Sequence, residues 1–302
     1  MRRAVQVGRG DLVLIAVAIA AVSTSAPLIR EAQAPALAIA FWRNAFAVVV
    51  LAPVCAVWRR GEIARLGPAP ARGALLAGVL LSAHFATWVP SLSFTTVASS
   101  VALVATQPVW AALLARARGD HVPGQAWLGI GVAVAGAATL TGVDVAISGR
   151  AFVGDLLALA GGILAAGYVT VGSDVRQTVS TTVYTTICYA TAAVLLGVGC
   201  LGGGAALSGY DTRTWVCLLG LTAGPQFLGH SLVNRVLRTT SATVVSVAIL
   251  FEIVGSTVIA WVAFGETPPA GAYPAAVLIA AGTVLVVLAG RPGAAPPAPT
   301  VD

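Results

Sequence analysis

The chain has 302 residues, of which 58% are hydrophobic and only 9% are charged, and its mean hydropathy is +0.92. A soluble globular protein carries about 25% charged residues, so this composition excludes a soluble enzyme, a DNA-binding protein and a disulfide-stabilised scaffold. It predicts a polytopic membrane protein with little mass outside the bilayer. The net charge of +6 needs no nucleic-acid partner, because positive residues collect in the cytoplasmic loops of membrane proteins.

Apolar runs fill most of the chain. A helix needs about 20 apolar residues to cross the hydrocarbon core, and ten runs approach that length with short connections between them: 12–29, 35–58, 74–89, 96–114, 126–143, 152–171, 183–201, 214–236, 243–264 and 272–289. The sequence therefore predicts an all-α integral membrane protein with ten transmembrane helices. The first run follows two Arg, as a signal peptide would, but nine more runs follow it, so we expect an uncleaved helix.

The arginines predict the orientation. The chain has 17 Arg and no Lys. With the N-terminus inside, 13 Arg fall on inner segments, 3 on outer segments and one, Arg43, within a span. Because cytoplasmic loops carry the positive excess, both termini are expected to be cytoplasmic. The Pro/Ala-rich tail 291–302 is predicted to be a disordered cytoplasmic segment.

The two halves of the chain echo one another. Similar short motifs recur in the same order at offsets of 144 to 146 residues: Gly10-Asp11-Leu12 and Gly154-Asp155-Leu156, His84 and His230, Thr95-Thr96 and Thr239-Thr240, and Gly119-Asp120 and Gly265-Glu266. Five spans in each repeat place the halves in opposite orientations. We therefore expect two inverted five-helix repeats, 1–148 and 149–290, an arrangement that suits a carrier with its site near the midplane.

Polar residues within the first five spans are candidates for a solute site, because such residues are costly in a bilayer. Arg43 could bind a carboxylate with its fork of donors, or pair with a neighbouring carboxylate or reach the interface. His84 and Trp88 lie at i and i+4 on one helix face, which fits either a cavity lining or a helix interface. Gln107 precedes Pro108, a residue that opens a kink and is a hinge candidate.

In the second half, Gln226 and His230 begin a polar stripe that continues at Asn234, and this stripe is expected to face protein or water. Glu252 is expected near mid-depth of the ninth span. A carboxylate there could couple flux to protons or bind an ammonium group, or it could be a protonated packing residue. Ser256 lies one turn beyond Glu252 on the same face.

Other residues have simpler interpretations. Asp11, Asp120, Asp155 and Glu266 lie at the ends of spans, where we expect them to cap helices or hold loops. The four cysteines are expected to be apolar packing residues. The GxxxG spacing of Gly199 and Gly203 indicates close helix contact, with a homodimer face as a further candidate. The sequence has neither an HExxH nor a GxSxG motif, and it predicts no catalytic residue, cofactor or metal.

Three stretches carry a resemblance to a known family. They are Ala40-Phe41-Trp42-Arg43-Asn44-Ala45, the segment 96–109 with its closing Gln-Pro, and the segment 241–266, which ends in Phe264-Gly265-Glu266. On these motifs and on the ten-span pattern, the chain resembles the EamA-type members of the drug/metabolite transporter superfamily. The resemblance implies a cytoplasmic-membrane carrier, commonly an exporter of amino acids or other small metabolites.

The sequence thus predicts a transporter of a small metabolite that works by alternating access, with coupling to protons as a further hypothesis. The expected partners are a small-molecule solute, protons and the lipid bilayer, with a homodimer as an additional candidate. An uncoupled facilitator or channel-like permease is the alternative. An intramembrane aspartyl protease is excluded, because Asp11 and Asp211 fall on opposite sides of the membrane and cannot meet.

Overall fold

The computed structural model describes residues 9–119, 121–229, 232, 236 and 248–289, and within these ranges the regular structure is helical throughout. Eight helical stretches are apolar and long enough to cross a membrane, and α14 (Phe251–Phe264) is a shorter apolar helix. The prediction of an all-α membrane protein is confirmed. The predicted tail 291–302, Asp120, His230 and Asn234 lie outside the described residues.

The first half of the chain begins with α1 and α2, which follow one another in a single apolar stretch, and ends with α8. Its elements are α1 (Arg9–Ser23), α2 (Ser25–Glu31), α3 (Ala36–Trp58), α4 (Arg60–Ala64), α5 (Pro68–Ser91), α6 (Val97–Val104), α7 (Gln107–Ala117) and α8 (Gly124–Ile147). The predicted span 96–114 is interrupted between α6 and α7. Pro108 lies in the first turn of α7, where its missing N–H costs nothing.

The second half consists of α9 (Gly149–Val175), α10 (Thr181–Gly202), α11 (Thr212–Leu221), the π-helix η1 (Thr222–Gly229), α14 and α15 (Ala272–Ala289). The predicted α-helix over 214–236 therefore changes to a π-helix at Thr222. Pro225 lies inside η1, and proline cannot donate the backbone hydrogen bond of an α-helix. The wider turn changes which side chains share a face, so an i, i+4 pattern does not hold through η1.

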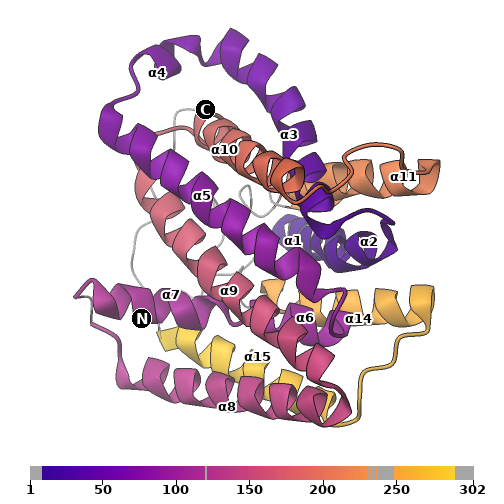
Figure 1. Cartoon of the computed structure of the whole chain (residues 1–302). Helices are drawn as coiled ribbons and strands as arrows, with labels where there is room; N and C mark the ends of the chain where they lie inside the picture. Colours follow the sequence, from indigo (N-terminus) through magenta and orange to yellow (C-terminus); the bar gives the residue numbers. More distant parts are fainter. Residues whose placement is uncertain (1–8, 120, 230–231, 233–235, 237–247, 290–302) are drawn as a thin grey trace.

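Helices from the two halves pair with one another across the molecule (Figure 1). The equivalent helices of the halves are in contact in three places, α3 with α10, α6 with α14, and α8 with α15. Contacts between non-equivalent helices also come in matched pairs. The contact of α5 with α9 corresponds to the contact of η1, which follows α11 in the repeat position of α5, with α1, which holds the repeat position of α9. This exchange of partners is what two similar repeats would give, and it places the packing surface of each half against the other.

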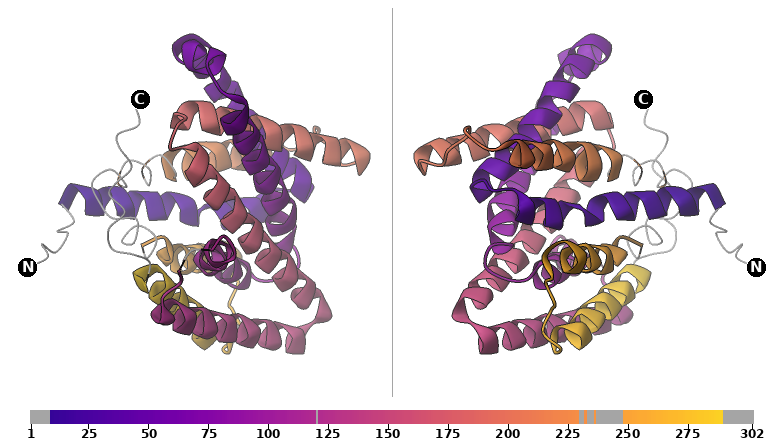
Figure 2. Two further views of the ribbon diagram at one scale, coloured as in Figure 1. Left: turned by 90° about the vertical axis from the view of Figure 1, so that its left-hand side faces the viewer. Right: turned by 90° about the vertical axis from the view of Figure 1, so that its right-hand side faces the viewer.

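Glycines allow α8 and α15 to approach closely, and the two helices lie side by side in Figures 1 and 2. A Cβ atom at Gly129 would lie 2.6 Å from the carbonyl oxygen of Gly282, and one at Gly136 would lie 2.7 Å from the backbone nitrogen of Ile279. Small residues at a helix interface permit this backbone contact, which is a principal source of attraction between helices in lipid.

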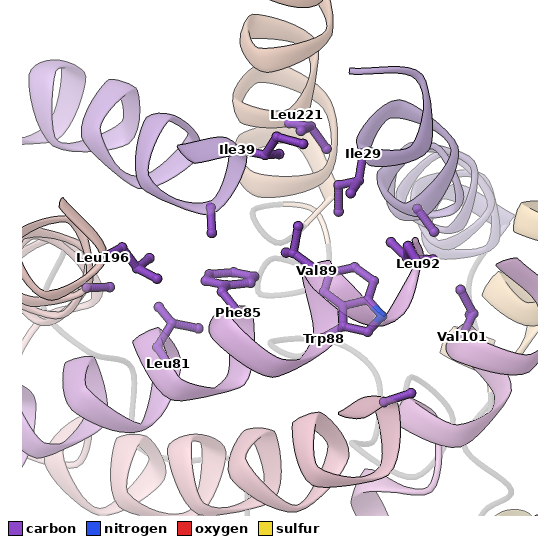
Figure 3. Close-up of a cluster of buried hydrophobic side chains, with 14 of the residues drawn as sticks. Ile29, Ile39, Leu81, Phe85, Trp88, Val89, Leu92, Val101, Leu196 and Leu221 are labelled. Atoms are coloured by element: carbon purple, nitrogen blue, oxygen red, sulfur yellow. The ribbon is translucent and has the colours of Figure 1, made fainter. Parts of the chain in front are cut away.

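The largest buried apolar cluster lies where α5 meets helices of both halves (Figure 3). Phe85, Trp88 and Val89 on α5 belong to it, together with Ile39 of α3 and Leu221 of α11. All five side chains are buried. Phe85 of this cluster also contacts Arg43, a polar residue at the centre of the bundle.

One end of the bundle is tied by polar contacts between the halves. We call it the Arg30 end, and it comprises residues 30–35, 92–97, 148–150, 207–214 and 265–271. Arg30 forms a salt bridge of 3.4 Å with Glu266 and also donates to the carbonyl oxygens of Leu92 and Thr95. Glu266 in turn accepts a hydrogen bond of 2.6 Å from the backbone N–H of Val97.

Further contacts reinforce the Arg30 end. Arg213 pairs with Glu31 at 2.6 Å, the backbone N–H of Gln33 donates to the hydroxyl of Thr214, and Arg150 donates to the carbonyl oxygen of Ser93. The prediction that Glu266 holds a loop agrees with these contacts. These bonds join loops from both halves at this end of the bundle.

Candidate functional site

The polar centre of the bundle is built around Arg43. Its helix, α3, places the side chain inward, where it is only 3% exposed. The guanidinium donates from Nε to Oε1 of Gln226 at 3.1 Å and lies over the ring of Phe85, 4.4 Å from the ring centroid. The Nη1 atom is buried and has no hydrogen-bond partner among the described residues. Part of a strong cationic donor is therefore unused.

Gln226 reaches Arg43 from the π-helix η1. It is 4% exposed, and its amide Nε2, like Nη1 of Arg43, is buried without a described partner. The hydroxyl of Thr222, one turn earlier, donates to the backbone carbonyl oxygen of Arg43 at 3.3 Å. The two helices are thus fixed against each other, with two N–H groups left to donate hydrogen bonds to a ligand.

Two more polar side chains border the pair. Tyr189 of α10 lies next to both Gln226 and Arg43. Glu252 lies in the first turn of α14, is partly exposed, and interacts through its charge with Arg43. The centre therefore combines donors from both repeats with a carboxylate at its edge. Neither Tyr189 nor Phe85 was predicted as a site residue, because an aromatic residue in an apolar run is indistinguishable from packing.

Ser256 does not join Glu252 in this centre. It is fully buried and its hydroxyl donates to the carbonyl oxygen of Ser23 at 3.1 Å, which connects α14 to α1. The adjacent Gly255 leaves room for this approach, since a Cβ atom there would clash with the side chain of Ser23. The hydroxyl of Ser256 is used to pack helices.

His84 and Trp88 lie at the contact of α5 with α9. The Nδ1 atom of His84 is 2.9 Å from the carbonyl oxygen of Gly161. A carbonyl only accepts, so Nδ1 carries the proton of this bond. The rings of His84 and Trp88 stack with their centroids 5.5 Å apart. Both side chains are buried, which favours an interface role, although the indole nitrogen of Trp88 has no described partner.

Gln107 and Pro108 begin α7 after the interruption at Ala105 and Thr106. The hydroxyl of Thr106 donates to the carbonyl oxygen of Leu103 at 2.6 Å and accepts from the indole of Trp110 at 3.0 Å. These bonds occupy the polar groups at the break. In the described part of the chain, Gln107 forms no hydrogen bond with Arg43 or Gln226.

Asp155 corrects one prediction. The N-cap of α9 is Ser148, whose side chain accepts from the N–H of Ala151, whereas Asp155 lies in the second turn and is 1% exposed. It therefore does not cap the helix. Its neighbour Asp144, at the end of α8, is also 1% exposed. This proximity was not predicted, because the predicted fifth span stopped one residue before Asp144.

The comparisons with known proteins agree with this fold. The model of the EamA-like transporter family matches residues 9–142 and 152–288, which is most of the chain. No curated protein matches the chain. Among solved structures, one titled "Crystal structure of protein" is similar to it, with 17% sequence identity, a TM-score of 0.62 and coverage of 94% of this chain and 99% of the other. At that identity the likeness shows the fold alone.

Proposed function

Because the chain belongs to the EamA-like transporter family, we propose that it carries a small metabolite, an amino acid or a related solute, across the cytoplasmic membrane and works as an exporter. It is a multi-pass membrane protein of the drug/metabolite transporter type. With the excess of Arg on the inner segments, both termini are cytoplasmic and the Arg30 end is external.

The observation that carries the proposal is the pair of unused donors at the bundle centre. Nη1 of Arg43 and Nε2 of Gln226 are buried and come from different repeats; Nη1 has no described acceptor, and the Gln226 amide has only the hydroxyl of Tyr189 beside it. A buried donor left unpaired costs free energy, so an acceptor-bearing solute would bind strongly there. A carboxylate fits the guanidinium fork best, and the ring of Phe85 supplies apolar contact beside it.

The transport cycle we propose is alternating access. In the proposed cycle, the contacts of the Arg30 end hold the external side closed, and the solute binds between the repeats at Arg43 and Gln226, a proposal supported by the ion pair of Arg30 with Glu266 and the hydrogen bond of Arg43 with Gln226. Breaking the Arg30–Glu266 bridge would release the loops that carry Leu92 and Thr95 and expose the site to the outside. Pro108 and the break before α7 are the hinge candidate for this motion.

Glu252 is the proposed coupling residue, with His230 as a further candidate that lies outside the described residues. A carboxylate beside Arg43 can bind either a proton or the ammonium group of a solute. Glu252→Gln should preserve the fold but remove the dependence of flux on a proton gradient in reconstituted vesicles. If the wild-type flux is indifferent to the gradient, the protein is an uncoupled facilitator, and Glu252 serves binding or structure.

The substrate class is tested with purified protein. A ligand that binds the folded state raises its thermal stability by mass action. A panel of amino acids, other organic acids and nucleosides should contain carboxylates that stabilise the wild type and leave Arg43→Gln unaffected. Stabilisation of both proteins by the same solutes would refute binding at Arg43. Arg118→Gln, which changes an exposed arginine at the opposite end of the bundle, is the matched control.

A further inference from the structure

A second pair of buried charges lies away from the solute site, at the Arg30 end. Asp144 lies in the last turn of α8 and Asp155 lies in the second turn of α9, and each is 1% exposed. Thr95 connects them, because its hydroxyl is 3.3 Å from Oδ2 of Asp144 and its backbone abuts Gly154, where a Cβ atom would lie only 2.8 Å from the nitrogen of Thr95.

The carboxylate of Asp155 is buried beside a second carboxylate. Its polar neighbours among the described residues are Asp144, Thr95 and Thr141, with no arginine or other cation among them, and neither of its oxygens makes a hydrogen bond of good geometry. Two adjacent carboxylates cannot both be ionised cheaply in a low-dielectric site. A carboxyl group that keeps its proton becomes a donor, and the carboxylate beside it is then the natural acceptor.

The charged and titratable groups on the surrounding elements are engaged elsewhere. Arg150 donates to Ser93, Arg30 binds Glu266 and the carbonyl oxygens of Leu92 and Thr95, and His84 is bound to Gly161. The remaining such groups on helices α5, α7, α9 and α15 are not among the described residues that act on Asp155: Arg72, Arg116, Tyr168, Asp174 and Tyr273. No positive side chain therefore neutralises the pair.

The aspartate pair is also connected, through Thr95, to the ion pair of Arg30 with Glu266. Thr95 turns its hydroxyl to Asp144 and its carbonyl oxygen to Arg30, which bridges to Glu266. A second negative charge behind Thr95 would repel the first and draw water between α8 and α9. This would disturb the segment that holds Arg30 in place.

We propose that Asp144 and Asp155 form a proton-binding site that keeps the Arg30 end closed while it holds its proton and favours opening when it loses it. The ligand is the proton itself, taken from the side of the membrane that the Arg30 end faces. The site is separate from Glu252 and does not depend on which solute is carried. An acidic medium at this end should therefore favour closure, and an alkaline medium should favour opening.

The test measures the conformation without any solute. Cysteines replace Ser93 and Thr267, which are exposed on loops of different halves at the Arg30 end, whereas the four native cysteines are buried. Spin labels are attached to the two new cysteines, and pulsed electron paramagnetic resonance measures the distance between the loops in lipid nanodiscs. For the wild type, the long-distance population should rise at least about fivefold from about pH 5.5 to about pH 8, the low end of usual coupling strengths.

Asp155→Asn should remain closed at both pH values, because its amide can donate to Asp144 as the protonated carboxyl group does. Asp174→Asn changes an exposed carboxylate that pairs with Arg118 at the opposite end, and it should respond like the wild type. Glu252→Gln should also respond, which separates this site from the solute site. An unchanged pH response in Asp155→Asn, or no response in the wild type, would overturn the proposal.

Infrared spectroscopy gives a second readout that needs no change to the pair. In Glu252→Gln, the absorption of a buried protonated carboxyl group should be present at low pH and disappear over the same pH range as the loops separate. If no such absorption is found at low pH, the pair does not hold a proton and the proposal fails, whether or not the asparagine variant folds.

Discussion

The Arg30 end and the bundle centre are both rich in polar side chains, but they use them differently. At the Arg30 end, Arg30 binds Glu266 and two carbonyl oxygens. At the centre, Arg43 uses one nitrogen on Gln226 and leaves Nη1 buried without a described partner. Paired groups hold a conformation, whereas unpaired buried donors cost stability that a ligand can recover. The comparison distinguishes residues that close the protein from residues that bind.

The largest expected effect is at the centre. Arg43→Gln should lower the affinity for a carboxylate solute on the order of 100-fold, as expected when one partner of a buried charged pair is removed. The stability of the unliganded protein should change little, because the lost hydrogen bond to Gln226 is offset by removal of an incompletely paired buried charge, which is itself costly. Ligand titration and thermal unfolding of the same sample measure the two quantities. A large loss of unliganded stability would make Arg43 a structural residue.

A packing change gives the next largest effect and separates stability from binding. Gly129→Ala places a Cβ atom against the backbone of α15 and should lower the free energy of unfolding by about 1–3 kcal/mol, the usual cost of overpacking. Gly131→Ala, on the same helix with no atom within 4 Å of its Cβ position, should be tolerated. Equal stability of the two variants by thermal unfolding would show that α8 and α15 do not pack as described.

At the Arg30 end the expected pattern is the reverse of that at Arg43. Glu266→Gln removes the charge that binds Arg30, and it should lower stability by about 1 kcal/mol and increase opening at this end. Arg118→Gln, at an exposed ion pair on the opposite end, should cause no opening. Loop distances from spin labels and thermal unfolding test the prediction. Opening in both variants would mean that the Arg30 end has no special role.

His84 gives the smallest effect among the buried positions. His84→Ala removes the bond to the carbonyl oxygen of Gly161 and should lower the free energy of unfolding by about 1 kcal/mol, the net value of a typical hydrogen bond. Solute affinity should be unchanged, as measured by ligand titration. A large loss of affinity would instead show that His84 takes part in solute binding and not only in the α5–α9 interface.

The helical fold was predictable from the sequence because its signals are local. Each span is an apolar run of sufficient length, and the recurrence of Gly10-Asp11-Leu12 as Gly154-Asp155-Leu156 indicated the repeat. Element ends were less accurate. The π-helix after Thr222 was missed, although Pro225 in an apolar run was a sign of a break.

The site was predictable only in part, since its residues meet through tertiary contacts. Arg43 and Gln226 stood out individually as polar residues in apolar runs, but their hydrogen bond joins residues 183 positions apart. Phe85 and Tyr189 carried no polar or spacing signal. Asp144 and Asp155 were separated in the prediction by a boundary between spans, whereas in the structure α8 packs against α9 and Thr95 contacts both helices.

The most direct test of the central claim compares amino acids with the corresponding amino acid amides, which lack the carboxylate, as ligands in thermal unfolding of the purified protein. If Arg43 and Gln226 bind the carboxylate of a solute, the acids should raise the unfolding temperature of the wild type. The amides should not do so, and neither ligand should stabilise Arg43→Gln. Equal stabilisation by acid and amide, or equal stabilisation of wild type and Arg43→Gln, would contradict it.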